Sequence, residues 1–200
     1  YMEAILHPDI RILSIATRPD CLSTEILDLL ERLNQIKPVW VELGLQTIHE
    51  RTARYIRRGY GLPVFETAVS ELRRRGIDII VHTILCLPGE TKSDMLQTIQ
   101  YLNRQDIQGI KLQLLHILKD TDLAEIYASD PFPVPDPQEY YELLGACISH
   151  LRPDIVIHRL TGDGPKELLT APLWTCNKRQ VLNQLQSYFK THDIWQGKEY

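Results

Sequence analysis

Long apolar runs, closely spaced cysteines and a strong charge of one sign are all missing from this 200-residue sequence. No apolar run approaches the roughly 18 residues that span a bilayer, and the amino terminus lacks a signal-peptide pattern, so we expect a cytoplasmic protein without a membrane partner. The net charge of -4 offers no general attraction for nucleic acid. The four cysteines, Cys21, Cys86, Cys147 and Cys176, are scattered, which argues against a zinc knuckle or a disulfide framework.

The apolar patterns along the chain predict an α/β fold. With 44% hydrophobic side chains, the chain can bury one substantial core and is most simply one domain. Strand-like runs alternate with helical patterns, which is typical of a parallel sheet covered by helices. The expected strands lie at 11–17, 38–47, 76–87, 109–118 and 154–162. The expected helices lie at 23–36, 63–76, 93–105, 121–129 and 138–151.

Two architectures fit this order of elements, a doubly wound sheet and part of a (β/α) barrel. Only about five strands are visible, whereas a complete eight-stranded barrel takes about 250 residues, so we expect an incomplete barrel over residues 1–177. The tail 178–200 is expected to pack as a closing helical extension. In both architectures ligands bind at the carboxyl ends of the strands, so polar residues there are the functional candidates.

The expected strand 38–47 carries the clearest polar signal. Side chains alternate along a strand, so Glu42, Gly44 and Gln46 share one face. Such a face does not suit packing against helices, and we expect it to point into the barrel. Gly44 would leave room for a ligand, and Gln46 would offer both a donor and an acceptor at the rim. The alternative is that Gln46 merely caps the next helix.

The expected strand 76–87 places a histidine inside an apolar run that ends in "LPGET". The same alternation puts His82, Ile84 and Cys86 on one face. A lone strand histidine is commonly a satisfied core residue, but here the neighbouring strand presents Gln46 at a similar height. Pro88 and Gly89 would turn backbone amides and carbonyls toward a pocket, which suits a flat heterocycle.

Several segments, in order along nearly the whole chain, resemble the radical S-adenosylmethionine (radical SAM) superfamily. The segments that carry the likeness are "ATRPDCL", "VELGLQT", "RRGY", "HTILCLPGET", "GIKLQLLHILKDT", "IVIHRLTGD" and "APLW". Within the superfamily they are similar to the YhcC-like family, which is related to the Elongator catalytic subunit and the coproporphyrinogen dehydrogenase group. The resemblance implies a partial (β/α) barrel that holds S-adenosylmethionine (SAM) against a 4Fe-4S cluster.

Roles for individual residues follow from the resemblance. It implies that Gln46 and His82 hydrogen-bond the ribose of SAM, and that Arg58 pairs with its methionine carboxylate. A guanidinium can engage a carboxylate through two parallel hydrogen bonds, which agrees with that role. The alternative for Arg58 is a surface arginine at an arginine-rich helix end. The full set of expected cofactor residues is Glu42, Gly44, Gln46, Arg58, His82, Ile84, Leu87 and Pro88, the last three against the adenine.

The sequence also departs from the superfamily pattern. The loop of three close cysteines that binds the cluster is absent, and so is the glycine-rich strand end that holds the methionine amine. The four scattered cysteines cannot replace that loop. The resemblance therefore implies that this chain is the carboxyl-terminal two-thirds of such an enzyme, that an upstream region binds the cluster, and that this chain alone is inactive. Cys86 and Tyr60 stand where relatives have glycine and histidine.

The complete enzyme is expected to cleave SAM reductively to methionine and a 5′-deoxyadenosyl radical that abstracts hydrogen from an unknown substrate. The electron would come from an external donor. Lys111, His116 and Arg159, together with Gln113, lie in late strands where a substrate would approach, and they are the candidate catalytic residues. Their alternative role is a salt bridge inside the barrel. Kinship with a tRNA-modifying branch suggests tRNA as the substrate by analogy only.

Two other classes of function remain open on the sequence. One is a half-barrel that binds a substrate or partner without chemistry of its own. The other is an ordinary (β/α)-barrel lyase or isomerase that uses Lys111 or His116 as a base.

Overall fold

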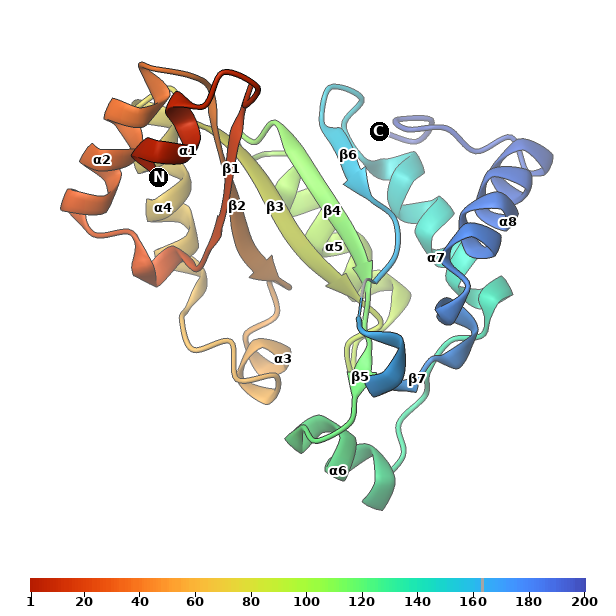
Figure 1. Cartoon of the computed structure of the whole chain (residues 1–200). Helices are drawn as coiled ribbons and strands as arrows, with labels where there is room; N and C mark the ends of the chain where they lie inside the picture. The colour runs from red at the N-terminus through yellow and green to blue at the C-terminus, as the bar shows by residue number, and fades with distance from the viewer. Residues whose placement is uncertain (163) are drawn as a thin grey trace.

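The sheet of this protein has five parallel strands in chain order (Figure 1). The computed structural model describes residues 1–162 and 164–200. Neighbouring strands follow the order β1, β2, β3, β4, β6, and every pairing is parallel. Their bounds are β1 Leu13–Thr17, β2 Val39–Gln46, β3 Asp78–Leu85, β4 Gly109–Leu114 and β6 Val156–Arg159. The prediction of a parallel sheet is confirmed.

Helices follow the strands as the amphipathic patterns indicate. Ser23 accepts a hydrogen bond from the Ile26 amide and caps α2, while Thr91 with Asp94 forms a capping box that begins α5. Gly76, at a φ of +67°, follows the end of α4. The α-helices are α1 Met2–Leu6, α2 Thr24–Asn34, α3 Glu50–Tyr55, α4 Leu62–Arg74, α5 Lys92–Leu102, α6 Asp122–Ser129, α7 Pro137–His150 and α8 Lys178–Thr191. Short 3-10 turns lie at Pro19–Cys21, Lys166–Leu168 and Leu173–Cys176.

One expected strand is split in the structure. The run 109–118 was predicted as a single strand, but β4 ends at Leu114. The chain then forms β5, Ile117–Leu118, which pairs antiparallel with β7, Leu169–Ala171, outside the main sheet. The prediction of one continuous strand is therefore wrong at its carboxyl end, where the chain turns out of the barrel sheet.

The two faces of the sheet differ. On β2, Val39, Val41, Leu43 and Leu45 are fully or almost fully buried and belong to one hydrophobic core with residues of α2, α4, α5, α7 and α8. The opposite face carries Glu42, His82 and Lys111, which are only partly buried. A sheet with helices on one face and a polar inner face is typical of a barrel, and this excludes the doubly wound alternative.

The sheet is strongly curved. The rings of Trp40 on β2 and His158 on β6 meet edge to face, with centroids 5.4 Å apart, although β3 and β4 lie between these strands. Gly109 lies beneath them on β4, and a Cβ there would approach the His158 ring to 2.6 Å. Among the described residues β1 and β6 remain the two edges, so the chain forms a partial barrel of the expected kind.

The carboxyl-terminal tail joins the same core. Val181 and Leu185 of α8 are buried in the hydrophobic cluster, and α8 packs on α7 (Figure 1). The predicted helix is present, while a boundary at residue 177 stays a prediction. None of the described helices is long and apolar enough to cross a bilayer.

Candidate functional site

A cavity of about 440 Å³ lies where β2, β3 and the chain beyond β4 end. Four of the expected cofactor residues line it together, namely Gln46, Arg58, Ile84 and Leu87. Other residues that line the cavity were not predicted from the sequence. They include Arg18, Tyr60, Leu115 and the α6 residues Leu123 and Ile126. Its position at the carboxyl ends of parallel strands is where barrel proteins bind their ligands.

Gln46 brings a buried polar group without a partner among the described residues to the wall of this cavity. It ends β2 at a φ of +68°, where the register with β3 shifts by one residue, so its side chain leaves the regular alternation of the strand. Its Oε1 is buried and has no hydrogen-bond partner among the described residues. The helix-capping alternative is not observed, because α3 begins after His49 without a side-chain cap. A buried, unpaired acceptor at a cavity wall fits a ligand that brings a hydroxyl or amino donor.

Gly44 and Tyr60 lie beside Gln46. A Cβ at Gly44 would come within 3.2 Å of the Tyr60 hydroxyl and 3.3 Å of the Gln46 Nε2, so the glycine leaves the space that these two side chains use. The Tyr60 hydroxyl donates to the Gly44 carbonyl at 2.8 Å. Burial raises the pKa of Tyr60, which keeps this donor protonated at neutral pH.

Arg58 is buried, with a side chain only 2% exposed, so the surface alternative is wrong. Its Nε donates to the Tyr60 carbonyl at 2.9 Å, and its Nη1 donates to the carbonyls of Leu45 at 3.2 Å and Thr47 at 2.6 Å. Its Nη2 donates to Glu50 at 2.9 Å. These hydrogen bonds connect the end of β2 with the segment that follows α3. They use four of the five N–H groups of the guanidinium, which leaves one for a ligand. The two-bond pairing with the methionine carboxylate stays a prediction and would require one of these bonds to be exchanged.

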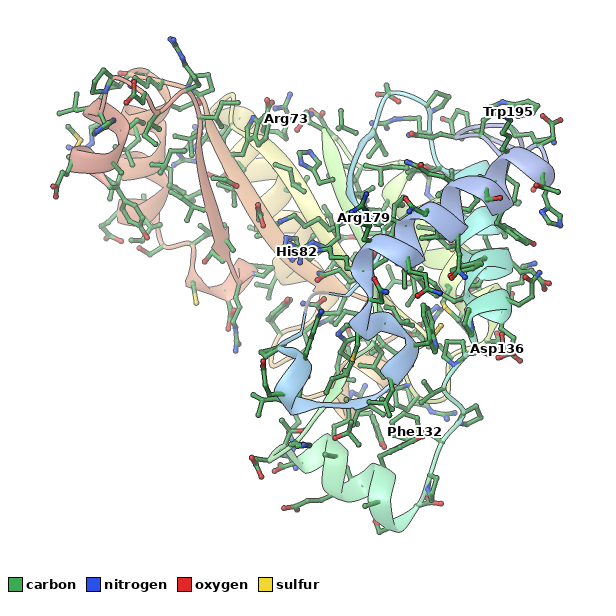
Figure 2. The ribbon with its side chains drawn as sticks, turned by 45° about the vertical axis from the view of Figure 1, so that its right-hand side comes forward. Arg73, His82, Phe132, Asp136, Arg179 and Trp195 are labelled. Atoms are coloured by element: carbon green, nitrogen blue, oxygen red, sulfur yellow. The ribbon has the colours of Figure 1, made fainter. Side chains whose placement is uncertain are left out.

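Glu42 and His82 lie one layer deeper in the barrel, with Lys111. Glu42 Oε2 accepts from Lys111 Nζ at 2.5 Å and from His82 Nε2 at 2.8 Å, and Glu42 Oε1 accepts from Ser14 Oγ at 2.9 Å. Gln113 Nε2 lies 3.3 Å from His82 Nδ1 and can only donate to it. His82 is therefore assigned as the neutral ring with its proton on Nε2. Figure 2 shows His82 near the centre of the molecule.

The pKa shifts agree with this network. Burial alone would raise the pKa of Glu42, but hydrogen bonds from Lys111, Ser14 and His82 prevail and bring it to about 2. Burial lowers the pKa of His82, and the charge of Lys111 acts in the same direction against the hydrogen bond to Glu42. At neutral pH the network thus holds an ionised carboxylate and a neutral imidazole. Because both nitrogens of His82 have partners inside the chain, its expected contact with ribose stays a prediction.

The Leu-Pro-Gly turn separates two cavities. Ile84, Leu87 and Leu115 give the first cavity an apolar wall that suits a flat ring. Pro88 instead lines a second cavity of about 500 Å³, between the turn, the proline-rich segment and α7. Leu87 lines both. Cys86 lines the second cavity, and burial raises its pKa to about 12, so it is a protonated thiol at neutral pH.

The expected substrate-side residues do not all come together. Lys111 and Arg159 face each other in the register of β4 and β6. His116 lies beyond the end of β4, and its Nδ1 accepts from the Gly164 amide at 3.2 Å. A Cβ at Gly162 would approach the His116 ring to 2.4 Å, so this ring is packed against backbone. The structure therefore supports Lys111 and Arg159 as one group and leaves His116 outside it.

The chain offers no cluster ligands in its described part. No group of three or more His, Cys, Asp or Glu side chains in residues 1–162 and 164–200 is arranged to hold a metal ion. The four cysteines are all free thiols.

Comparison with known proteins agrees with the fold. Residues 2–102 match the Radical SAM superfamily, and residues 107–191 match the Radical SAM C-terminal domain. The chain is 39% identical over 190 residues to protein YtqA of Bacillus subtilis, covering 95% of this chain and 59% of YtqA. It is 33% identical over 195 residues to protein YhcC of Escherichia coli, covering 97% of this chain and 63% of YhcC. The chain thus spans about three fifths of the length of these relatives.

A solved structure shares the fold. The archaeal Elp3 of Methanocaldococcus infernus superimposes with a TM-score of 0.79 at 18% identity, over 92% of this chain and 43% of that one. At this identity the likeness concerns the fold alone.

Proposed function

The chain belongs to the radical SAM superfamily, and from this we propose that it supplies the SAM-binding barrel wall of a larger enzyme. The observation that carries the proposal is the buried, unpartnered Oε1 of Gln46 in a cavity at the carboxyl ends of the strands. When bound beside a reduced 4Fe-4S cluster held by an upstream region, SAM supplies a 5′-deoxyadenosyl radical for hydrogen abstraction. An external donor would provide the electron.

The chain's own residues bind and orient the cofactor. Gln46 accepts a hydrogen bond from a ribose hydroxyl, while Ile84, Leu87 and Leu115 exclude water from the adenine. A ribose contact of His82 would require its Nδ1 to exchange the Gln113 amide for a hydroxyl. Arg58 would offer its remaining N–H to the methionine carboxylate. Lys111 and Arg159 lie deeper, where a substrate would meet the reacting end of the cofactor.

Calorimetric titration of SAM into the chain tests the cavity. Gln46→Ala removes one neutral hydrogen bond and should weaken binding by about 1 kcal/mol, roughly fivefold. Gln97→Ala is the matched control, because Gln97 lies exposed on α5 and bonds only Ser93. Equal affinities in the two variants would mean that SAM does not use this cavity.

A second measurement separates the classes of function. The protein with its flanking sequence, reconstituted anaerobically with iron and sulfide and then reduced, should release 5′-deoxyadenosine and methionine from SAM. If SAM binds in the cavity but no 5′-deoxyadenosine forms, the half-barrel is a binding module. If SAM does not bind at all, the hypothesis of a lyase or isomerase that uses Lys111 is favoured over the radical SAM hypothesis.

A further inference from the structure

Helix α6 lies outside the hydrophobic core of the chain. Figures 1 and 2 both show it beyond the carboxyl ends of the strands, away from the other helices. All of its residues are exposed or half-buried. Two of its half-buried apolar side chains, Leu123 and Ile126, line the first cavity. A flat ligand in that cavity would remove more of their surface from water, which would hold α6 against it.

The segment that carries α6 is anchored to the rest of the chain before and after the helix. The Lys119 amide donates to the Leu168 carbonyl at 2.7 Å. The Trp174 indole Nε1 donates to the Pro135 carbonyl at 3.0 Å. Between these anchors the chain turns at Asp120, which has a φ of +60°, forms α6 and continues through the proline-rich segment. The helix is thus held at its two sides and not by its own burial.

One ion pair joins α6 to the opposite wall of the cavity. Arg57 Nη1 donates to the carboxylate of Asp122, and both residues line the cavity. Among the described residues, this is the one hydrogen bond or ion pair that connects residues 120–134 with a segment distant in sequence. The two side chains are 75% and 63% exposed, so water competes for the pair and it can open and close readily.

The charges of the two segments favour the closed position. Residues 50–58 carry four arginines and one glutamate, whereas residues 119–130 carry four acidic residues and one lysine. Opposite charges on facing walls attract over about a Debye length and are screened by salt. Arg57 itself has a φ of +54°, which is uncommon for a residue other than glycine and is typical of positions under a functional demand.

We propose that α6 is a lid over the cofactor cavity and that Arg57 is a positioning residue that holds the lid closed through Asp122. The inference rests on the proposed function in one respect, that SAM is the ligand beneath the lid. Opening of the ion pair lets the ligand enter and leave. Its closure places Leu123 and Ile126 against the ligand and excludes water.

The rates of SAM binding, taken from the line shapes of nuclear magnetic resonance titrations, test the lid. Arg57→Gln should raise the association and dissociation rates together, each about two- to fivefold, and should change Kd by less than about twofold. Both rates rise because the lid must open for either step. Arg57→Lys keeps the ion pair and should keep the rates. Arg54→Gln is the matched control, because it removes the same charge from an exposed arginine of α3 that makes no hydrogen bond or ion pair with the described residues.

A double-mutant cycle tests whether Arg57 acts through α6. Asp122→Asn should raise both rates as Arg57→Gln does, and the double variant should exceed neither single variant. Glu125→Gln, which removes an exposed charge of α6 outside the pair, is the control on that helix. Additive effects of the two single variants would overturn the proposal. So would a faster dissociation in Arg57→Gln with unchanged association, which would mean that Arg57 contacts SAM directly.

A readout without SAM separates the lid from the cofactor site. Relaxation dispersion of the ¹³C-labelled methyl groups of Leu123 and Ile126 reports exchange between closed and open positions. Arg57→Gln should change this exchange, and Arg54→Gln should not. Identical dispersion in the wild type and Arg57→Gln overturns the lid, even where Gln46→Ala weakens SAM binding as expected. If the methyl groups respond to Arg57→Gln and SAM does not bind, the lid stands and the cofactor proposal fails.

Discussion

Glu42 and Glu71 are two carboxylates whose pKa lies at about 2, and their surroundings differ. Glu42 sits inside the barrel with an 18% exposed side chain. Glu71 lies on the outer surface of α4, where hydrogen bonds from Arg74 and Arg75 lower its pKa. The Glu71 side chain is 35% exposed, about twice as much as that of Glu42, so salt should screen the interactions of Glu71 more strongly.

Glu42→Gln should change the acid limb of the stability curve. The pKa of Glu42 is lowered from 4.5 to about 2 on folding, so its stabilisation is present above pH 4.5 and is lost as the pH falls toward 2. The unfolding free energy of the variant should be lower by roughly 1–3 kcal/mol at pH 7, with the difference closing by pH 2. Denaturant titrations across this range measure it.

Salt supplies the control for that experiment. The effect of Glu42→Gln should persist in 1 M sodium chloride, at a Debye length of about 3 Å, whereas any effect of Glu71→Gln should largely disappear. A Glu42 difference that is independent of pH would show that folding does not shift the pKa of this carboxyl group.

A separate prediction concerns Arg58, because the hydrogen bonds of its side chain are to other residues of the same chain. Arg58→Ala leaves the Leu45 and Thr47 carbonyls without their donor and should lower the unfolding free energy by roughly 3–5 kcal/mol. If Arg58 also holds the carboxylate of SAM, affinity should fall by about 30- to 1000-fold, well beyond the effect at Gln46.

Both quantities are measured on one sample, by thermal unfolding and by calorimetry at a temperature where the variant remains folded. A loss of stability with unchanged affinity for SAM would show that Arg58 stabilises the fold and does not bind the cofactor. Unchanged stability would contradict the bonding described above.

At the scale of elements, the alternation along β2 and β3 is enough to predict which side chains face inward. Glu42 and His82 do share the inner face, as expected from sequence. The partners of these side chains depend on the register between strands, which cannot be predicted from the local sequence. In the structure His82 is level with Lys111, and Gly44 is level with His82. The deviations arise at contacts between distant segments. The break after Leu114 accompanies the packing of His116 against Gly162 and Gly164.

The burial of Arg58 has a similar cause. An arginine-rich end of a helix resembles a solvated surface when it is read alone. Gln46 adopts a positive φ at the end of β2, and the carbonyls of Leu45 and Thr47 on either side of it accept from Arg58. Tyr60 then stacks on the guanidinium, 5.0 Å from ring centroid to Cζ. Leu115 and the α6 wall of the cavity are likewise tertiary neighbours with no signal in the sequence.

At the scale of the whole molecule, the open barrel predicts how protection against hydrogen exchange is distributed. β1 pairs with β2 alone, and the Leu13 amide donates to the Pro38 carbonyl at 3.0 Å. Backbone amides alternate in direction along a strand, so those of Ile15 and Thr17 also face β2, while those of Ser14 and Ala16 face away. In the described part of the chain no further strand lies on that side.

Exchange rates read residue by residue by nuclear magnetic resonance should therefore alternate along β1. Ser14 and Ala16 should exchange at least about 100-fold faster than Ile15, and Val81, in the middle of the sheet on β3, should be the slowest of the four. The neighbours within β1 serve as controls for each other, because fraying of the whole strand would accelerate all of its amides alike. Equal protection of Ser14 and Ile15 at dilute concentration would contradict an open edge and would mean that another segment or chain covers β1.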